Sequence, residues 1–424
     1  MSRTPRSTRP TSARLTARAA ALYVLVASAS AARGAERAVS TRTSEVPIET
    51  LSTLASWGDL LLVEPDREDR PGQAALFGFV PAPPEQVFEV VADVRRYTDF
   101  IDTMTHIRVL EEKDGLLAYR WVATVPPLVR MDGVRLQRAR PPHLIEVRGH
   151  SGALRGTRER FELHPVPGGT LLAMYRSLDL ETGHVLLRTV AGVDPSMEQG
   201  INLSTLLIHF RGVRALMTRD RPADPEPRAG DVDPAPESPG VRPLPIEDHL
   251  DALAPLLEHG TVALVQSTST GPVAQVLLAE SVAAPAATVR EVIRRADRWP
   301  DFIDSLESQT MTPSGEDSWD LEWKISIPMG SVGGTSRMKV HPDGTIIVDT
   351  LSGDIRSGRA HWVARERGEG RSILVHHSYS DLREASWLLG LLLSAEPYLE
   401  HGILGAAGTL AVTRIKARAE ELTP

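Results

Sequence analysis

The stretch TDFIDTM, Thr98–Met104, returns as PDFIDSL, Pro300–Leu306, so that Asp-Phe-Ile-Asp stands at 99–102 and again at 301–304. This offset of 202 residues holds well beyond the motif. The matching residues include Gly58 and Gly260, Pro83 and Pro285, Trp121 and Trp323, and the segments DPSMEQGI (194–201) and EPYLEHGI (396–403). A repeat this long is a duplicated domain, because solenoid units are only about 20–50 residues. We therefore expect one fold used twice.

The chain length and the join between the copies set the expected domain boundaries. A chain of 424 residues suits two or three domains, and a copy of about 170 residues is large enough for its own core. Residues 219–246 are rich in proline and charge, which predicts an extended linker. We expect domains at 46–218 and 247–422, each able to fold alone.

The N-terminus differs in composition from the rest of the chain. Residues 1–18 carry five arginines and no acid, and a small-apolar run with Ala29-Ser30-Ala31 follows. This layout is typical of a secretory signal peptide over residues 1–31. We therefore expect an exported protein, periplasmic or extracellular, whose native N-terminus lies between Ser30 and Ala32.

Charge and cysteine content narrow the classes of partner and chemistry. The formal net charge is −8, and loss of residues 1–31 would leave −13. Such a chain is not expected to bind nucleic acid, which requires clustered basic charge. The sequence has no cysteine and no HExxH motif, so we expect no disulfide, no metal and no other cofactor.

Both copies predict the same order of elements. A short helix (48–57, 247–258) is followed by a strand after Gly58 or Gly260 and a second strand (74–80, 273–280). A helix opened by Pro83 or Pro285 comes next, and each copy closes with a long helix from Pro195 or Pro397. Strands are expected between these helices, near 129–138, 143–148, 157–164 and 169–178, and near 333–341, 344–350, 358–365 and 371–380.

The clearest strand is SWDLEWKISI, residues 318–327. Trp319, Leu321, Trp323, Ile325 and Ile327 alternate with polar residues, which predicts one buried and one solvated face. In the first copy the equivalent face carries Leu117, Tyr119, Trp121, Ala123 and Val125.

This order of elements, together with PPEQVFEVVADVRRYTDFID (83–102), resembles the START-like superfamily with the helix-grip fold. It is most similar to the polyketide cyclase and coenzyme-Q-binding branch, over about 74–218 and 273–421. The resemblance implies an α+β fold in which a curved antiparallel sheet wraps a long C-terminal helix. It also implies an apolar cavity between sheet and helix.

Two motifs carry a catalytic interpretation beside a structural one. Asp99 and Asp102, with Asp301 and Asp304, provide paired carboxylates for acid–base chemistry, or they cap a turn whose Phe and Ile pack inward. No histidine, lysine or metal-ligand pattern stands beside them, which favours the turn. GHSG (149–152) is one residue short of a nucleophile elbow and lies between strands, so we assign no catalytic residue.

The expected cavity supplies the candidate ligand-binding residues. They are Phe100, Tyr119, Trp121, Val125, Met197 and Ile201 in the first copy, and Phe302, Trp319, Leu321, Trp323, Ile325, His377, Leu399 and Ile403 in the second. The most apolar segment, ASWLLGLLLSAEP (385–397), lies where the family has a lid. It is a buried short helix, or a lid that touches a membrane through Trp387, Leu389 and Leu392.

The function expected from these features is noncovalent binding of a hydrophobic small molecule, a lipid or an isoprenoid-like compound. Two other functions remain open, a cyclase or aromatase enzyme and an interaction module with a closed cavity. Convergent inward polar groups would favour the enzyme, and a filled interior would favour the interaction module.

Overall fold

The computed structural model describes residues 39–65, 72–125, 129–178, 196–219, 249–267, 273–327, 330–396 and 398–423. The expected signal peptide (1–31) and nearly all of the expected linker (219–246) lie outside these residues. From Val39 onward the chain forms one compact unit.

The first domain has the predicted order of elements with one further strand, β3, which the sequence analysis did not predict. Its helices are α2 (Ile48–Trp57), α3 (Pro84–Ala92), the 3-10 helix η1 (Val94–Asp99) and α5 (Ser196–Thr218). Its strands are β1 (Asp59–Glu64), β2 (Gln73–Val80), β3 (Met104–Lys113), β4 (Leu116–Val125), β5 (Val129–Arg140), β6 (Leu144–Gly152), β7 (Arg158–Val166) and β8 (Gly169–Ser177).

The second domain repeats this order. Its helices are α6 (Ala254–Leu257), α7 (Ala286–Arg294), η3 (Ala296–Asp301), α8 (Trp387–Ala395) and α9 (Leu399–Glu421). Its strands are β9 (Thr261–Ser267), β10 (Val273–Val282), β11 (Leu306–Gly315), β12 (Ser318–Ile327), β13 (Gly330–Val340), β14 (Ile346–Gly353), β15 (Gly358–Glu366) and β16 (Ser372–Ser380). Of the helix expected over 247–258, the described residues 249–258 form an α-helix only over Ala254–Leu257.

The repeated Asp-Phe-Ile-Asp ends the 3-10 helix of each domain. Asp99 and Asp301 are the last residues of η1 and η3, and a turn then leads into β3 or β11. Ile101 and Ile303 are buried beneath this turn, whereas all four aspartates are exposed. The inward packing expected of the two isoleucines is therefore confirmed, and the capping role of the aspartates stays a prediction.

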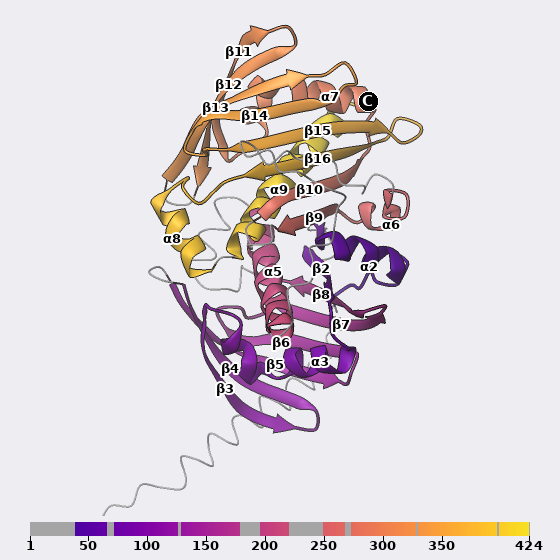
Figure 1. Cartoon of the computed structure of the whole chain (residues 1–424), viewed down its shortest axis with the longest axis vertical. Coiled ribbons are helices and arrows are strands. Elements are labelled where there is room, and N and C mark those ends of the chain that lie inside the picture. The colour runs from indigo at the N-terminus through magenta and orange to yellow at the C-terminus, as the bar shows by residue number, and fades with distance from the viewer. Residues whose placement is uncertain are drawn as a thin grey trace, which may run out of the picture. The chain divides into compact units, whose positions relative to one another are not determined.

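In each domain an antiparallel sheet curves around one long helix (Figure 1), so the predicted α+β helix-grip fold is confirmed. The two half-sheets are continuous, and β1 pairs with β9 to give one sheet of 16 strands within the described residues. Their order is β11-β12-β13-β14-β15-β16-β10-β9-β1-β2-β8-β7-β6-β5-β4-β3.

The join between the halves is symmetric with respect to the repeat. The β1–β9 pairing centres on Leu61 opposite Ala263, which are equivalent residues in the 202-residue register. Next to it α5 packs on α9, with Gly200 against Ala406 and Gly402 against Ser204, and these two contacts are also exchanged by the repeat. Each domain thus presents the same surface to the other, as the subunits of a two-fold dimer do.

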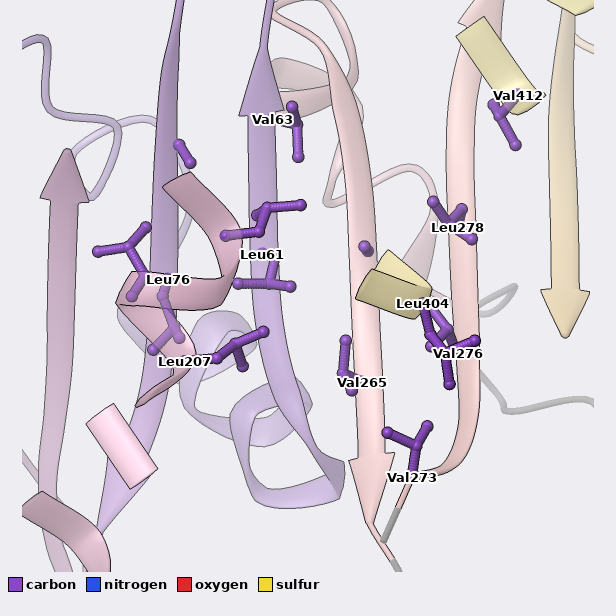
Figure 2. Close-up of a cluster of buried hydrophobic side chains, with 14 of the residues drawn as sticks. Leu61, Val63, Leu76, Leu207, Val265, Val273, Val276, Leu278, Leu404 and Val412 are labelled. Carbon is purple, nitrogen blue, oxygen red and sulfur yellow. The ribbon is translucent and has the colours of Figure 1, made fainter. Parts of the chain in front are cut away.

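One apolar core runs through this join. Figure 2 shows Leu61, Leu76 and Leu207 of the first domain with Val265, Leu278 and Leu404 of the second in a single buried cluster. Separation of the halves would expose this cluster and the edges of β1 and β9. Independent folding of each half stays a prediction, and this shared core is the surface that each half would have to expose.

The closeness of α5 and α9 can be tested with two glycines of the same helix. A methyl group at Gly402 would overlap Cα and Oγ of Ser204, whereas one at Gly405 would lie 3.8 Å from Leu203 Cδ1. We predict that Gly402→Ala destabilises the protein by about 1–3 kcal/mol because the helices must separate. Gly405→Ala should instead stabilise it by up to about 1 kcal/mol through helix propensity. Urea unfolding checks both, and equal effects at the two positions would contradict the packing described.

Candidate ligand sites in the two domains

The face of each half-sheet that is covered by its long helix is called here the inner face. In the second domain Leu278 packs under α9, and its partner across β10 and β16 is His376. In the first domain Leu76 lies in the same core as α5 residue Leu207, and its partner is Met174. Because side chains alternate along a strand, these positions determine which residues face inward.

Three charged side chains converge on the inner face of the first domain. Arg135 on β5 and Arg176 on β8 both pair with Glu159 on β7, with N–O distances of 3.2 Å and 2.8 Å. The three residues are only 7%, 3% and 4% exposed. They form a buried Arg–Glu–Arg triad, which we call the inner triad.

Aromatic and polar groups surround the inner triad. The Arg135 guanidinium lies 5.3 Å from the centre of the Trp121 ring, and Arg135 is directly opposite Tyr119 in the β4–β5 pairing. His209 on α5 is buried between the rings of Tyr97, Phe100 and Phe161, at centroid distances of 4.9, 5.9 and 5.2 Å.

Burial controls the protonation of these groups. It opposes ionisation of Glu159, but Arg135 and Arg176 outweigh it and hold the pKa of this carboxyl below its usual value. Burial lowers the pKa of His209 to about 3, and it raises the pKa of Tyr119 to about 12. Near neutral pH the triad is therefore charged, whereas His209 and Tyr119 are neutral.

Several polar atoms around the triad have no hydrogen-bond partner among the described residues. They include Arg135 Nε, Arg176 Nε, Thr157 Oγ1 and His209 Nε2. Tyr119 Oη interacts electrostatically with Arg135 but without the geometry of a hydrogen bond. Buried polar groups are normally satisfied, so such a group of open donors indicates a site for a ligand or for water.

The equivalent inner positions of the second domain carry no charge. On β12 and β13, Leu321 lies opposite Ser336, which corresponds to Tyr119 opposite Arg135 in the first domain. On β15 and β16, Ala360 lies opposite Ser378, which corresponds to Glu159 opposite Arg176. Ser336, Ala360 and Ser378 thus replace the inner triad. From β13 to β15 the equivalent residues are 201 rather than 202 apart, because this copy is one residue shorter before β13.

The inner face of the second domain is also less covered. Trp323, Ala360 and Ser378 are partly exposed, whereas Trp121, Glu159 and Arg176 are buried. Trp323 donates from Nε1 to Ser336 Oγ over 2.9 Å, and Trp362 stacks on His376 with centroids 3.7 Å apart. Burial lowers the pKa of His376 to about 3, so this wall is uncharged near neutral pH.

The predicted ligand-binding residues differ in their burial. Tyr119, Trp121 and Leu321 are buried, and the side chains of Val125 and Met197 lie outside the described residues. The remaining apolar and aromatic candidates are half-buried, namely Phe100, Ile201, Phe302, Trp319, Trp323, Ile325, Leu399 and Ile403. These positions give ligand binding no direct test, so it stays a prediction for each of them.

The prediction that His377 lines the space between the sheet and α9 is wrong. His377 is opposite Leu277, which belongs to the apolar cluster on the other side of the sheet, so it faces away from α9. Its neighbour His376 takes the inward position, because consecutive strand residues point to opposite faces.

The predicted lid is the helix α8. Ser386 caps it by accepting from Leu389 N, and Leu389 and Leu393 turn toward the core. Trp387 is 78% exposed and Leu391 is 38% exposed, one helical turn apart. Leu392 is half-buried. The exposed lid surface therefore centres on Trp387 and Leu391 rather than on Leu389.

The described residues provide neither a membrane-spanning helix nor a cluster of metal ligands. They contain no helix that is both long and apolar enough to cross a membrane. They also contain no group of three or more histidine, aspartate or glutamate side chains arranged to hold a metal ion.

Comparison with known proteins agrees with the architecture. The model of the family described as "Polyketide cyclase / dehydrase and lipid transport" matches residues 80–193 and again 282–395, and the chain belongs to this family. The comparison with curated proteins finds no match.

Solved structures of similar proteins include one with two domains. The di-domain ARO/CYC StfQ of the steffimycin biosynthetic pathway is 17% identical over 82% of this chain and 98% of its own, with a TM-score of 0.29. The Zhui aromatase/cyclase from Streptomcyes sp. R1128 is 19% identical over 35% of this chain and 93% of its own, with a TM-score of 0.30. A START superfamily protein from Mycobacterium smegmatis is 15% identical over 35% of this chain and 99% of its own, also with 0.30. TM-scores this low transfer no function to the present chain.

The buried state of His209 predicts a specific pH dependence. Its pKa is about 3 in the folded protein and about 6.5 when unfolded, so only the unfolded chain binds a proton between these values. The stabilisation from neutral His209 is complete above pH 6.5 and is lost as the pH falls toward 3. At pH 5 the loss is about 2 kcal/mol.

We therefore predict that His209→Phe, which keeps an aromatic ring at this position, reduces the fall in unfolding free energy between pH 7 and pH 5 by about 2 kcal/mol. Urea unfolding at both pH values measures it. His106→Phe, a substitution at an exposed histidine, is the control. An unchanged pH dependence in the His209 variant would show that folding does not lower the pKa of this histidine.

Proposed function

We propose that the protein binds an uncharged apolar small molecule, a lipid or an isoprenoid-like compound, between the sheet and α9 of the second domain, without covalent chemistry. The observation that carries this proposal is the partly exposed inner face around Trp323, Ala360 and Ser378. The same positions in the first domain are filled and buried.

The chemistry of this wall favours an uncharged ligand. Covering partly exposed Trp319, Trp323 and Ile325 would gain roughly 25 cal/mol for each Å² removed from water. Trp323 already donates to Ser336, which leaves hydroxyl groups of Ser336 and Ser378 to orient a polar end of the ligand. A charged group would meet no opposite charge among the three positions that replace the inner triad, and its burial there would be unfavourable.

The lid helix supports a route for exchange of this ligand. α8 connects the last strand of the second domain to α9, and its inner residues Leu389 and Leu393 pack on the core beside that helix. Its outer residues Trp387 and Leu391 offer apolar area to a membrane or to a donor lipid surface. Export of the chain, which the N-terminal residues predict, remains part of this proposal.

A cyclase-type enzyme in the first domain is the second candidate. The polar groups that converge around the inner triad favour an enzyme, because convergent inward polar groups are the feature expected of one. His209, with a pKa of about 3, and Tyr119, with a pKa of about 12, are both poorly matched to general acid–base catalysis near neutral pH. The described groups are better suited to donate hydrogen bonds than to transfer protons.

Ligand binding by the second domain can be measured with N-phenyl-1-naphthylamine, an uncharged fluorescent probe. We predict that Trp323→Ala weakens its binding about tenfold by removing an aromatic wall. Because Trp323 is only half-buried, the substitution should cost less than the about 3–5 kcal/mol of a fully buried tryptophan. Ala360→Phe should abolish binding by filling the space.

Leu117→Ala in the first domain is the matched control, since Leu117 is the counterpart of Trp319, and it should leave probe affinity unchanged. If Ala360→Phe folds and binds the probe like the wild type, the second domain is not the binding site.

Membrane contact by the lid requires outward-facing variants. We predict that Trp387→Asp with Leu391→Asp lowers co-sedimentation with neutral phosphatidylcholine vesicles at least tenfold, because each inserted side chain contributes roughly 1.5–3 kcal/mol. The binding should change little with salt, since it rests on apolar contact. Leu351→Asp, at an exposed leucine of β14, is the control. Equal sedimentation of all three proteins would exclude the lid as a membrane contact.

A further inference from the structure

We propose that the inner triad of the first domain is an anion-binding site that takes the carboxylate of an amphipathic ligand. This site lies in the other domain from the one proposed above, and the observations that support it are separate from those that support that proposal; only the contrast between the domains rests on the proposed function. It would give the two domains different ligand preferences, anionic for the first and uncharged for the second.

The first argument is the balance of charge. Arg135 and Arg176 contribute two positive charges and Glu159 one negative charge, and His209 is neutral, so the buried cluster carries a net charge of about +1. The nearest further ion pair on α5, Arg211 with Asp59, is balanced within itself. A buried net charge is strongly unfavourable unless an opposite charge accompanies it.

The second argument is the balance of hydrogen bonds. A guanidinium has about five N–H donors, and the two arginines share the single carboxylate of Glu159. Arg135 Nε, Arg176 Nε, Thr157 Oγ1 and Tyr119 Oη have no hydrogen-bond partner among the described residues, and all four residues are more than nine-tenths buried. Glu159 Oε1 pairs with both arginines but also has no hydrogen bond of good geometry, so the one carboxylate of the cluster leaves both arginine Nε–H groups unpaired. The two oxygens of a bound carboxylate would accept from these donors.

The third argument is the surrounding surface. The buried apolar cluster next to the triad contains Trp121 and Tyr97, with Phe100 packed against it. An apolar chain attached to the carboxylate would lie against these rings, and the charged end would meet the arginines. The ligand reaches the site only after local opening, because the triad is covered in this structure.

A purely structural role for the triad is the competing explanation, since buried ion-pair clusters also occur without a ligand. Two variants distinguish these explanations, because an anion site predicts that they change anion affinity in opposite directions. Arg135→Gln leaves the Glu159–Arg176 pair, with no net charge. Glu159→Gln leaves two arginines, with a net charge of about +2. A structural triad predicts only loss of stability in both, whereas an anion site predicts opposite effects on anion affinity.

The experiment compares dodecanoate with dodecanol, which share a chain length and differ in charge. Equilibrium dialysis at pH 8 uses the full chain carrying Ala360→Phe, so that the second domain does not contribute. We expect dodecanoate to bind at least tenfold more tightly than dodecanol. Arg135→Gln should remove this preference by weakening dodecanoate at least tenfold while dodecanol changes less than about threefold. Glu159→Gln should strengthen dodecanoate binding.

Two further variants keep the test decisive if a charge variant fails to fold. Arg135→Lys preserves the charge and should retain part of the preference for dodecanoate. Tyr119→Phe removes one donor and should weaken dodecanoate about fivefold with dodecanol unchanged. Equal binding of the two probes to the folded Ala360→Phe protein, or an unchanged ratio in every folded variant made in it, would overturn the anion site. Either result would leave the binding of the uncharged probe by the second domain as a separate question.

Discussion

The pairing of β1 with β9 is the constraint on which the rest of this structure depends. The half-sheet of the first domain has β1 at its edge, and that of the second domain has β9. An unpaired sheet edge exposes a row of backbone donors and acceptors that favours association with other chains. Five residue pairs, from Asp59 opposite Val265 to Val63 opposite Thr261, close both edges at once. The same contact brings α5 onto α9, so the two helices are held by each other as well as by their own sheets.

A symmetric join has a consequence for how the copies could diverge. A residue at the join contacts the equivalent region of the other domain, which restricts the side chains that it can carry. At Gly402, for example, Ser204 leaves no space for a side chain. Arg135, Glu159 and Arg176 lie on β5, β7 and β8, which take no part in the β1–β9 pairing, and they are not restricted in this way. Replacement of Arg135, Glu159 and Arg176 by serine, alanine and serine changes a charged, filled interior into an uncharged, partly exposed one, and the strand pairing is retained.

Sequence reasoning predicted most of the fold because the two copies supported each other. The alternation in 318–327 identified β12 and, through the repeat, β4, and the prolines before α3 and α7 marked both helix starts. β3 and β11 were missed because both faces of these strands are largely solvated, so no apolar alternation marks them. The composition of the linker predicted a division into two domains but not the pairing of β1 with β9, because composition says nothing about which strand edges will meet.

The inner triad was not predicted, and the reason is physical. Arg135 and Arg176 lie in strands where charged residues normally indicate the solvated face, so alternation argued against their burial. A buried charge is recognised only when its partners are known, and Glu159 is brought to both arginines by strand pairings that no local pattern specifies. Comparing the two copies at a fixed offset of 202 residues did not reveal the triad either. The offset between equivalent residues changes from 202 to 201 between β12 and β13, so a fixed offset misaligns Arg135 and Glu159, and only Arg176 is matched correctly. A site that depends on long-range strand pairing, in a region where the offset between the copies changes, leaves almost no signal in the sequence. The contrast between a charged interior in the first domain and an uncharged one in the second is therefore seen only in the folded structure.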